Sequence, residues 1–132
     1  MAESDIHISL VCQLKKYIID YLKIDHGFVL VDASSTLKNK KPPIVGGYIP
    51  DIYVKTKNTF IIADAKTAKD WQSKHSLDQY NAFVCECAKH ENSMFLLAVP
   101  WQYERSAHSR LKFLFPAQTS VKIEVISDMW GL

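Results

Sequence analysis

The 132-residue sequence has no apolar run approaching the ~18 residues that a membrane-spanning helix needs, so we expect no transmembrane segment. Cysteine is also scarce. Cys12, Cys85 and Cys87 cannot form a closed disulfide framework, which favours a reducing, cytoplasmic environment. Cys85 and Cys87 are too closely spaced for a structural zinc pair, and no second Cys/His pair has zinc-finger spacing. These absences argue against a membrane protein, a disulfide-stapled domain and a zinc finger.

The composition is that of an ordinary globular protein, with 48% hydrophobic and 23% charged residues. Internal repeats, low-complexity tracts and linkers are missing, so residues 1–132 are expected to form one domain. The net charge is only +2, but residues 36–70 hold seven basic and three acidic side chains. This local excess of positive charge suits an anionic partner such as a phosphate backbone, although short lysine runs commonly face water.

Hydrophobic periodicity predicts a helix, three strands, a helix, a strand, a helix and a last strand. Ser4 can cap the first helix, over about 5–23, whose expected buried stripe is Ile6, Leu10, Leu14, Tyr17/Ile18 and Tyr21/Leu22. The wholly apolar segment 28–31 predicts a central strand. The remaining expected elements are strands on either side of a turn at 56–59, a helix at 77–90, a strand at 94–99, a helix at 103–113 and an edge strand at 121–126.

Two carboxylates are expected to meet in the central hairpin. If Lys55 pairs with Phe60 across the turn, Asp51 falls opposite Asp64, where Cβ atoms are roughly 4.5–5.5 Å apart. Lys66 points to the same side as Asp64 because strand side chains alternate between faces. Carboxylates this close repel unless one is protonated or a cation lies between them, so the pattern predicts a divalent metal site beside a lysine.

The chemistry of this trio favours Mg²⁺, with Mn²⁺ as a substitute. Mg²⁺ takes oxygen ligands and keeps several waters, so two carboxylates and a carbonyl can suffice. His and Cys ligands near the pair would instead favour zinc. A carboxylate-bound Mg²⁺ and a lysine together suit phosphodiester hydrolysis, because both stabilise charge that develops on phosphate.

Pro50-Asp51, twelve intervening residues and then Asp64-x-Lys66, on this order of elements, resemble the PD-(D/E)xK nuclease superfamily. The resemblance covers roughly residues 3–100. It implies an α/β fold with a restriction endonuclease-like αβββαβ core, a mixed β-sheet flanked by helices. The superfamily includes restriction endonucleases, Holliday junction resolvases and repair exonucleases.

The resemblance also implies roles for individual residues. Asp51 and Asp64 would be metal ligands, with the backbone carbonyl of Ala65 completing that side. Lys66 would position or help to deprotonate the attacking water. Members often have a glutamate in the first helix, for which Glu3 fits the spacing best. Many carry a glutamine on the second helix, and Gln79 fits that place.

Each of these residues also has a structural interpretation. Asp64 and Lys66 can form an ion pair at a strand end, and Asp51 can begin a strand after a proline. Gln79 completes a capping-box pattern with Ser76, so a helix cap and a site residue are equally open. Further candidates for contacts to nucleic acid are His75, Trp71, Trp101, Tyr48 and the lysines at 38, 40 and 41.

The resemblance implies a Mg²⁺-dependent DNA endonuclease that hydrolyses phosphodiester bonds, cytoplasmic and, in a bacterium, nucleoid-associated. Because the chain has no evident separate recognition domain, we expect either a structure-specific homodimer or a catalytic subunit whose specificity comes from a protein partner. The alternative is a catalytically inactive nuclease-fold protein that binds nucleic acid or assembles a complex. Degenerate members of the superfamily usually lose one of Asp51, Asp64 and Lys66, and this chain retains all three.

Overall fold

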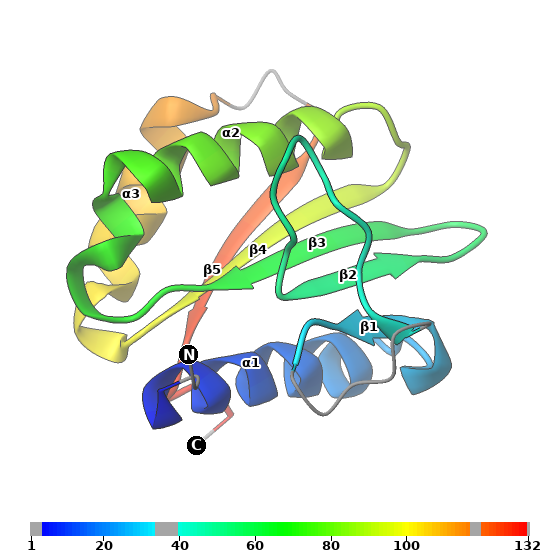
Figure 1. Ribbon diagram of the computed structural model, residues 1–132, viewed down its shortest axis with the longest axis horizontal. Coiled ribbons are helices and arrows are strands. Elements are labelled where there is room, and N and C mark those ends of the chain that lie inside the picture. The colour runs from blue at the N-terminus through cyan, green and yellow to red at the C-terminus, as the bar shows by residue number, and fades with distance from the viewer. Residues whose placement is uncertain (1–3, 34–39, 117–119, 132) are drawn as a thin grey trace.

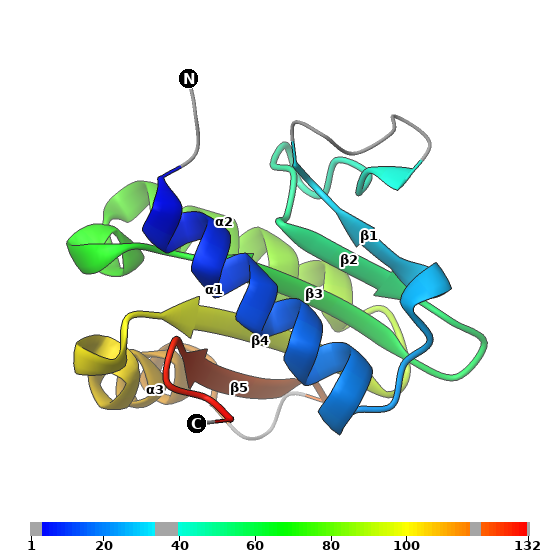
Figure 2. The ribbon, with the colours of Figure 1, turned by 90° about the horizontal axis from the view of Figure 1, so that it is seen from below.

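A five-stranded mixed sheet lies between two helical layers (Figures 1 and 2). The computed structural model describes residues 4–33, 40–116 and 120–131. The strand order is β1-β2-β3-β4-β5, in which β2 is antiparallel to both β1 and β3, and β3, β4 and β5 are parallel. Helix α1 covers one face of the sheet, and helices α2 and α3 lie on the other. The chain is therefore an α/β protein, as predicted.

The helices and strands follow the predicted order. The strands are β1 (Val29–Val31), β2 (Ile52–Lys55), β3 (Phe60–Ala65), β4 (Ser93–Val99) and β5 (Lys122–Ser127). The α-helices are α1 (Asp5–Lys16), α2 (Lys74–Cys87) and α3 (Glu104–Leu114). A π-helical turn (Tyr17–Tyr21) extends α1, and short 3₁₀ turns cover His26–Phe28, Ala68–Gln72 and Trp101–Tyr103.

Strands β3 and β4 are buried along their whole length because helices pack on both of their faces. Alternation divides β3 between two cores: Ile61 and Ala63 face α1, whereas Phe60 and Ile62 face α2. Asp64 continues the second series, toward α2. A carboxylate therefore occupies a position that the pattern of the strand assigns to the protein interior.

Three sequence-based predictions about the elements are wrong in detail. Segment 28–31 is not central: within the described part of the chain β1 pairs with β2 alone and forms an edge of the sheet, so its side chains are only half-buried. Ile6 and Tyr21 are exposed, and Val11 is buried in their place. At Tyr21, the change from α- to π-helical winding beginning at Tyr17 alters the angle between successive side chains, so the 3.6-residue stripe no longer holds.

Helix α2 begins three residues earlier than the hydrophobic pattern predicts. Its N-cap is Ser73, whose Oγ accepts a hydrogen bond from the backbone N–H of Ser76 at 3.1 Å. Ser76 itself lies inside the helix and is fully buried. The capping box predicted for Ser76 and Gln79 is therefore wrong, which leaves the Gln79 side chain available for another role. The caps predicted for α1 and the edge position of β5 are confirmed.

Within the described ranges, no helix combines the length and the apolar character that crossing a bilayer requires.

A tight turn anchors the segment that leads into β2. The backbones of Val45 and Tyr48 exchange two hydrogen bonds, and the turn residues Gly46 and Gly47 have φ of +59° and +91°. A Cβ on Gly46 would lie 2.7 Å from the Cβ of Ala82 on α2, whereas real Cβ contacts are longer. Glycine is thus required at position 46 both for its backbone conformation and for close packing on α2.

We expect Gly46→Ala to destabilise the protein by roughly 2–4 kcal/mol, combining backbone strain with overpacking. Ala82→Gly removes the methyl group that the new Cβ meets. In a double-mutant cycle measured by urea denaturation, Gly46→Ala should cost less in the Ala82→Gly background. Equal costs in the two backgrounds would show that the contact between Gly46 and Ala82 contributes nothing.

Candidate active site

The predicted hairpin register is confirmed. Lys55 pairs with Phe60 and Ile52 with Ala63, so the next position outward brings Asp51 toward Asp64. The turn at 56–59 is held by the Thr56 hydroxyl, which accepts hydrogen bonds from the backbone N–H groups of Asn58 and Thr59. No left-handed residue is needed there, because Asn58 does not have positive φ.

The two carboxylates are tied to each other through the backbone. The Asp51 N–H donates to Asp64 Oδ1 at 3.2 Å, and the Ala65 N–H donates to Asp51 Oδ2 at 2.8 Å. Asp64 is 3% exposed. Its second oxygen, Oδ2, is buried and receives no hydrogen bond from the described residues. Each strand thus positions the carboxylate of the other, at the point where the ladder ends.

Lys66 and Gln79 complete one side of the site. Lys66 Nζ lies 3.2 Å from Asp64 Oδ2, an electrostatic contact without hydrogen-bond geometry. The same ammonium group donates a hydrogen bond to Gln79 Oε1 on α2. Lys66 is only 9% exposed. Gln79 therefore supplies its ammonium group with a polar partner that water cannot readily replace. Gln79 thus contacts Lys66 and lines the same pocket, and it does not cap α2.

His7 is a member of the site that the sequence analysis missed. Its Nε2 lies 3.2 Å from Asp51 Oδ2, with the two side chains 22% and 14% exposed. Helix α1 brings it there from the opposite face of the sheet (Figure 2). One signal was present in the sequence: His7 lies in the first turns of the predicted first helix, next to its Ser4 cap. Glu3 itself lies outside the described residues.

The pKa values of the two carboxyls move in opposite directions. Burial and the neighbouring Asp51 carboxylate raise the pKa of Asp64 well above its usual range, and the ammonium of Lys66 offsets this only in part. Burial also acts to raise the pKa of Asp51, but hydrogen bonds with His7 and Asp64 outweigh it and lower the pKa. The two carboxyls therefore titrate as a coupled pair, with the more buried Asp64 the harder to ionise.

These residues line an open pocket of about 450 Å³. Among the described residues, no cluster of three His, Cys, Asp and Glu side chains forms a ready metal cage. The protein oxygens for a cation would come from Asp51, Asp64 and the carbonyl of Ala65, a sparse set that suits Mg²⁺ with its retained waters. The full lining is Ser4, His7, Ile49, Asp51, Asp64, Ala65, Lys66, Thr67, Asp70 and Gln79.

The remaining sequence candidates lie apart from the pocket lining. Trp71 is 5% exposed and packs in the core, as single aromatic side chains usually do, so its ring is not available to stack on bases. Trp101 is 58% exposed but lies in the short turn between β4 and α3. His75 is exposed, and its ring centroid lies 5.6 Å from that of Tyr48 in an edge-to-face contact. Lys38 falls outside the described residues.

Comparison of the chain with models of protein families, with curated proteins and with solved structures finds no match. The chemistry of the pocket is therefore the guide to what this protein does.

The elevated pKa of Asp64 predicts that this residue opposes folding at neutral pH. Its favourable contribution is complete below the unfolded pKa of about 3.9 and is lost as pH rises through the higher folded value. Asp64→Asn cannot ionise. Its melting temperature should exceed that of wild type by about 3 °C or more at pH ~8, the shift that ~1 kcal/mol produces in a domain of this size, and by less at pH ~4.

The measurement is thermal unfolding in EDTA, with Asp78→Asn as the control. Asp78 pairs with Lys74 at 2.9 Å on the exposed surface, so its replacement should change stability little. A lower melting temperature for Asp64→Asn at pH ~8 would mean that Asp64 and Lys66 form a stabilising ion pair rather than a strained site.

Proposed function

We propose that this protein is a Mg²⁺-dependent endodeoxyribonuclease of the PD-(D/E)xK superfamily. The observation that carries the proposal is the convergence of Asp51, Asp64 and Lys66 on one pocket from two paired strands. The order of elements through β4 agrees with the αβββαβ core that the resemblance implies.

The residues present fit a divalent cation. Burying two adjacent carboxylates is costly, and the buried Asp64 Oδ2 has no hydrogen-bond donor among the described residues. Asp51, Asp64 and the Ala65 carbonyl would hold the ion. When bound, the ion supplies Lewis acidity toward water and phosphate, which is the chemistry that phosphodiester hydrolysis at neutral pH requires.

The other side chains prepare the pocket for an anionic substrate. Lys66 presents a fixed positive charge next to the carboxylates, where it can hydrogen-bond to an attacking water and to the oxygens of the phosphate. Gln79 holds that ammonium through its amide oxygen and thereby limits the rotamers of a long, flexible side chain. His7 and the Ala65 N–H both bind Asp51 Oδ2, which orients the other oxygen toward the pocket.

The proposed substrate is DNA, and the proposed assembly is a homodimer or a complex with a partner that supplies specificity. This part of the proposal is supported by the small size of the domain and by the local excess of basic residues between positions 36 and 70.

The direct test is cleavage of supercoiled plasmid, single-stranded DNA and a four-way junction, each with Mg²⁺, with Mn²⁺ and with EDTA. We expect metal-dependent cleavage of at least one of these substrates. If none is cut at high protein concentration with either metal, the nuclease proposal is wrong. DNA binding without cleavage would then favour an inactive nuclease-fold protein that binds nucleic acid.

Asp64→Ala should lower the cleavage rate at least about a hundredfold, because several kcal/mol of transition-state stabilisation would be lost. DNA binding, measured by fluorescence anisotropy, should change little because basic side chains provide most ground-state affinity. Asp78→Ala is the matched control and should cleave at the wild-type rate. Wild-type cleavage by Asp64→Ala would refute the assignment of this site.

His7 is expected to set the metal requirement through Asp51. His7→Ala should raise the Mg²⁺ concentration for half-maximal cleavage about 10- to 100-fold, the usual effect of removing a group that orients a metal ligand. His7→Gln retains an N–H donor and should recover part of this loss. An unchanged Mg²⁺ requirement in His7→Ala, with native stability, would remove His7 from the site.

A further inference from the structure

A second polar pocket lies at the other end of the β2–β3 hairpin. It has a volume of about 340 Å³ and forms where the hairpin turn meets the connection from α2 to β4. We call it the hairpin pocket. Its lining residues are Lys55, Thr56, Lys57, Asn58, Thr59, Phe60, Lys89, His90, Glu91 and Asn92.

The hairpin pocket is rich in hydrogen-bond donors. Three lysines from two distant segments converge on it, accompanied by the amides of Asn58 and Asn92, and Glu91 is its single acidic lining residue. Lys89 is partly neutralised by Glu86, at 3.4 Å. Lys55 and Lys57 form no ion pair with the described residues, so their charges remain available to an external anion.

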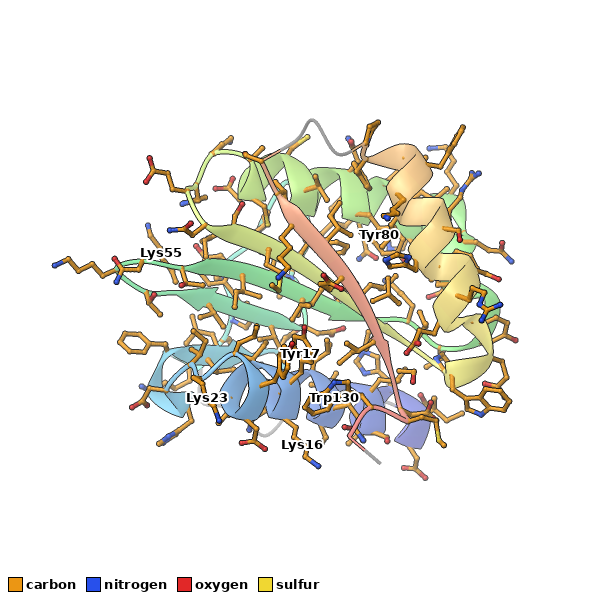
Figure 3. All side chains as sticks on the ribbon, turned by 180° about the vertical axis from the view of Figure 1, so that it is seen from behind. Lys16, Tyr17, Lys23, Lys55, Tyr80 and Trp130 are labelled. Carbon is orange, nitrogen blue, oxygen red and sulfur yellow. The ribbon has the colours of Figure 1, made fainter. Side chains whose placement is uncertain are left out.

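The walls of the hairpin pocket are held by packing rather than by the lysines. The Phe60 and His90 rings stack with centroids 3.7 Å apart and planes 10° from parallel, and His90 also contacts Glu86 at 3.1 Å. The Phe60 N–H donates to the carbonyl of Asn92, whose φ is +51°. The two turns are thus joined directly, and Lys55 extends outward from this end of the molecule (Figure 3).

The hairpin pocket lies along the same strand as the active site. From Phe60 to Asp64, β3 advances four residues, or about 13 Å at a rise of ~3.3 Å per residue. Along the axis of B-form DNA the same length corresponds to about four base pairs, at ~3.4 Å each. A nucleic acid strand that reaches the carboxylates can therefore place a phosphate several nucleotides away near the lysines.

We propose that the hairpin pocket is a second phosphate-binding site, which holds the backbone of the nucleic acid strand away from the scissile bond. The ligand is a phosphodiester of the strand, bound by Lys55, Lys57 and the neighbouring amide donors. This inference takes its ligand class from the proposed function. It assigns the hairpin pocket a role in affinity and positioning, with no part in the chemistry.

The test compares two double variants that remove the same charge. Lys55→Gln/Lys57→Gln changes the hairpin pocket, and Arg110→Gln/Lys112→Gln changes exposed residues of α3, at the opposite end of the molecule (Figure 1). Binding of a fluorescein-labelled 30-base-pair duplex is measured by anisotropy in EDTA, between about 50 and about 200 mM salt.

Loss of two phosphate contacts should make the plot of log binding constant against log salt concentration less steep by about 1.8 for the hairpin variant. Raising the salt fourfold would then weaken its binding about 12-fold less than that of wild type. The α3 variant should keep the wild-type slope. Equal effects in the two variants, or no effect in either, would overturn the proposal.

A competition experiment distinguishes a nucleic acid strand from a small phosphate-bearing molecule as the ligand of the hairpin pocket. Inorganic phosphate and AMP at about 1 mM should displace little duplex from wild type, because a single phosphate forms few of the contacts. Displacement by micromolar AMP that is lost in Lys55→Gln/Lys57→Gln would identify a free-nucleotide site and overturn the proposal. Because these titrations measure binding alone, they remain decisive even if no metal supports cleavage.

If cleavage is observed, the hairpin variant should show a raised KM and an unchanged kcat.

Discussion

The reciprocal clamp between Asp51 and Asp64 is the constraint on which the candidate site depends. Each carboxylate accepts a backbone N–H from the strand that carries the other, so neither can move away from its neighbour without losing a hydrogen bond. The fold thus holds together two groups that repel when both are charged, and it responds by raising the pKa of the more buried one. An arrangement of this kind costs stability, and a bound cation would relieve the cost.

All three layers of the protein meet at this clamp. The sheet supplies Asp51, Asp64 and Lys66, α1 supplies His7 and α2 supplies Gln79. The helices pack on opposite faces of the sheet, yet both reach the point where the β2–β3 ladder ends. Removal of either helix contact would leave one buried charged group with fewer polar partners. The same hairpin carries lysines at its far end. The β2–β3 hairpin therefore connects the candidate active site with the proposed second phosphate-binding site.

Local patterns predicted much of this fold. Hydrophobic runs and turn residues placed every strand, and the hairpin register followed from the position of a four-residue turn. Prediction failed where tertiary packing decides. The wholly apolar segment 28–31 predicts a central strand, but among the described residues no strand pairs with its outer side in the assembled sheet. The hydrophobic pattern starts α2 too late. Ser73 and Ser76 are both good caps, and the burial of Ser76 in the folded protein decides between them.

The placement of the three residues at the centre of the site follows from local sequence, because strand alternation and hairpin register decide which side chains share a face. The sequence contains Asp51, Asp64 and Lys66 at a spacing that those rules bring onto one face. Only the tertiary structure brought His7 to Asp51 and assigned Gln79 to Lys66. Both contacts depend on how far α1 and α2 slide and rotate against the sheet, and that depends on the packing of two whole cores rather than on any short stretch of sequence.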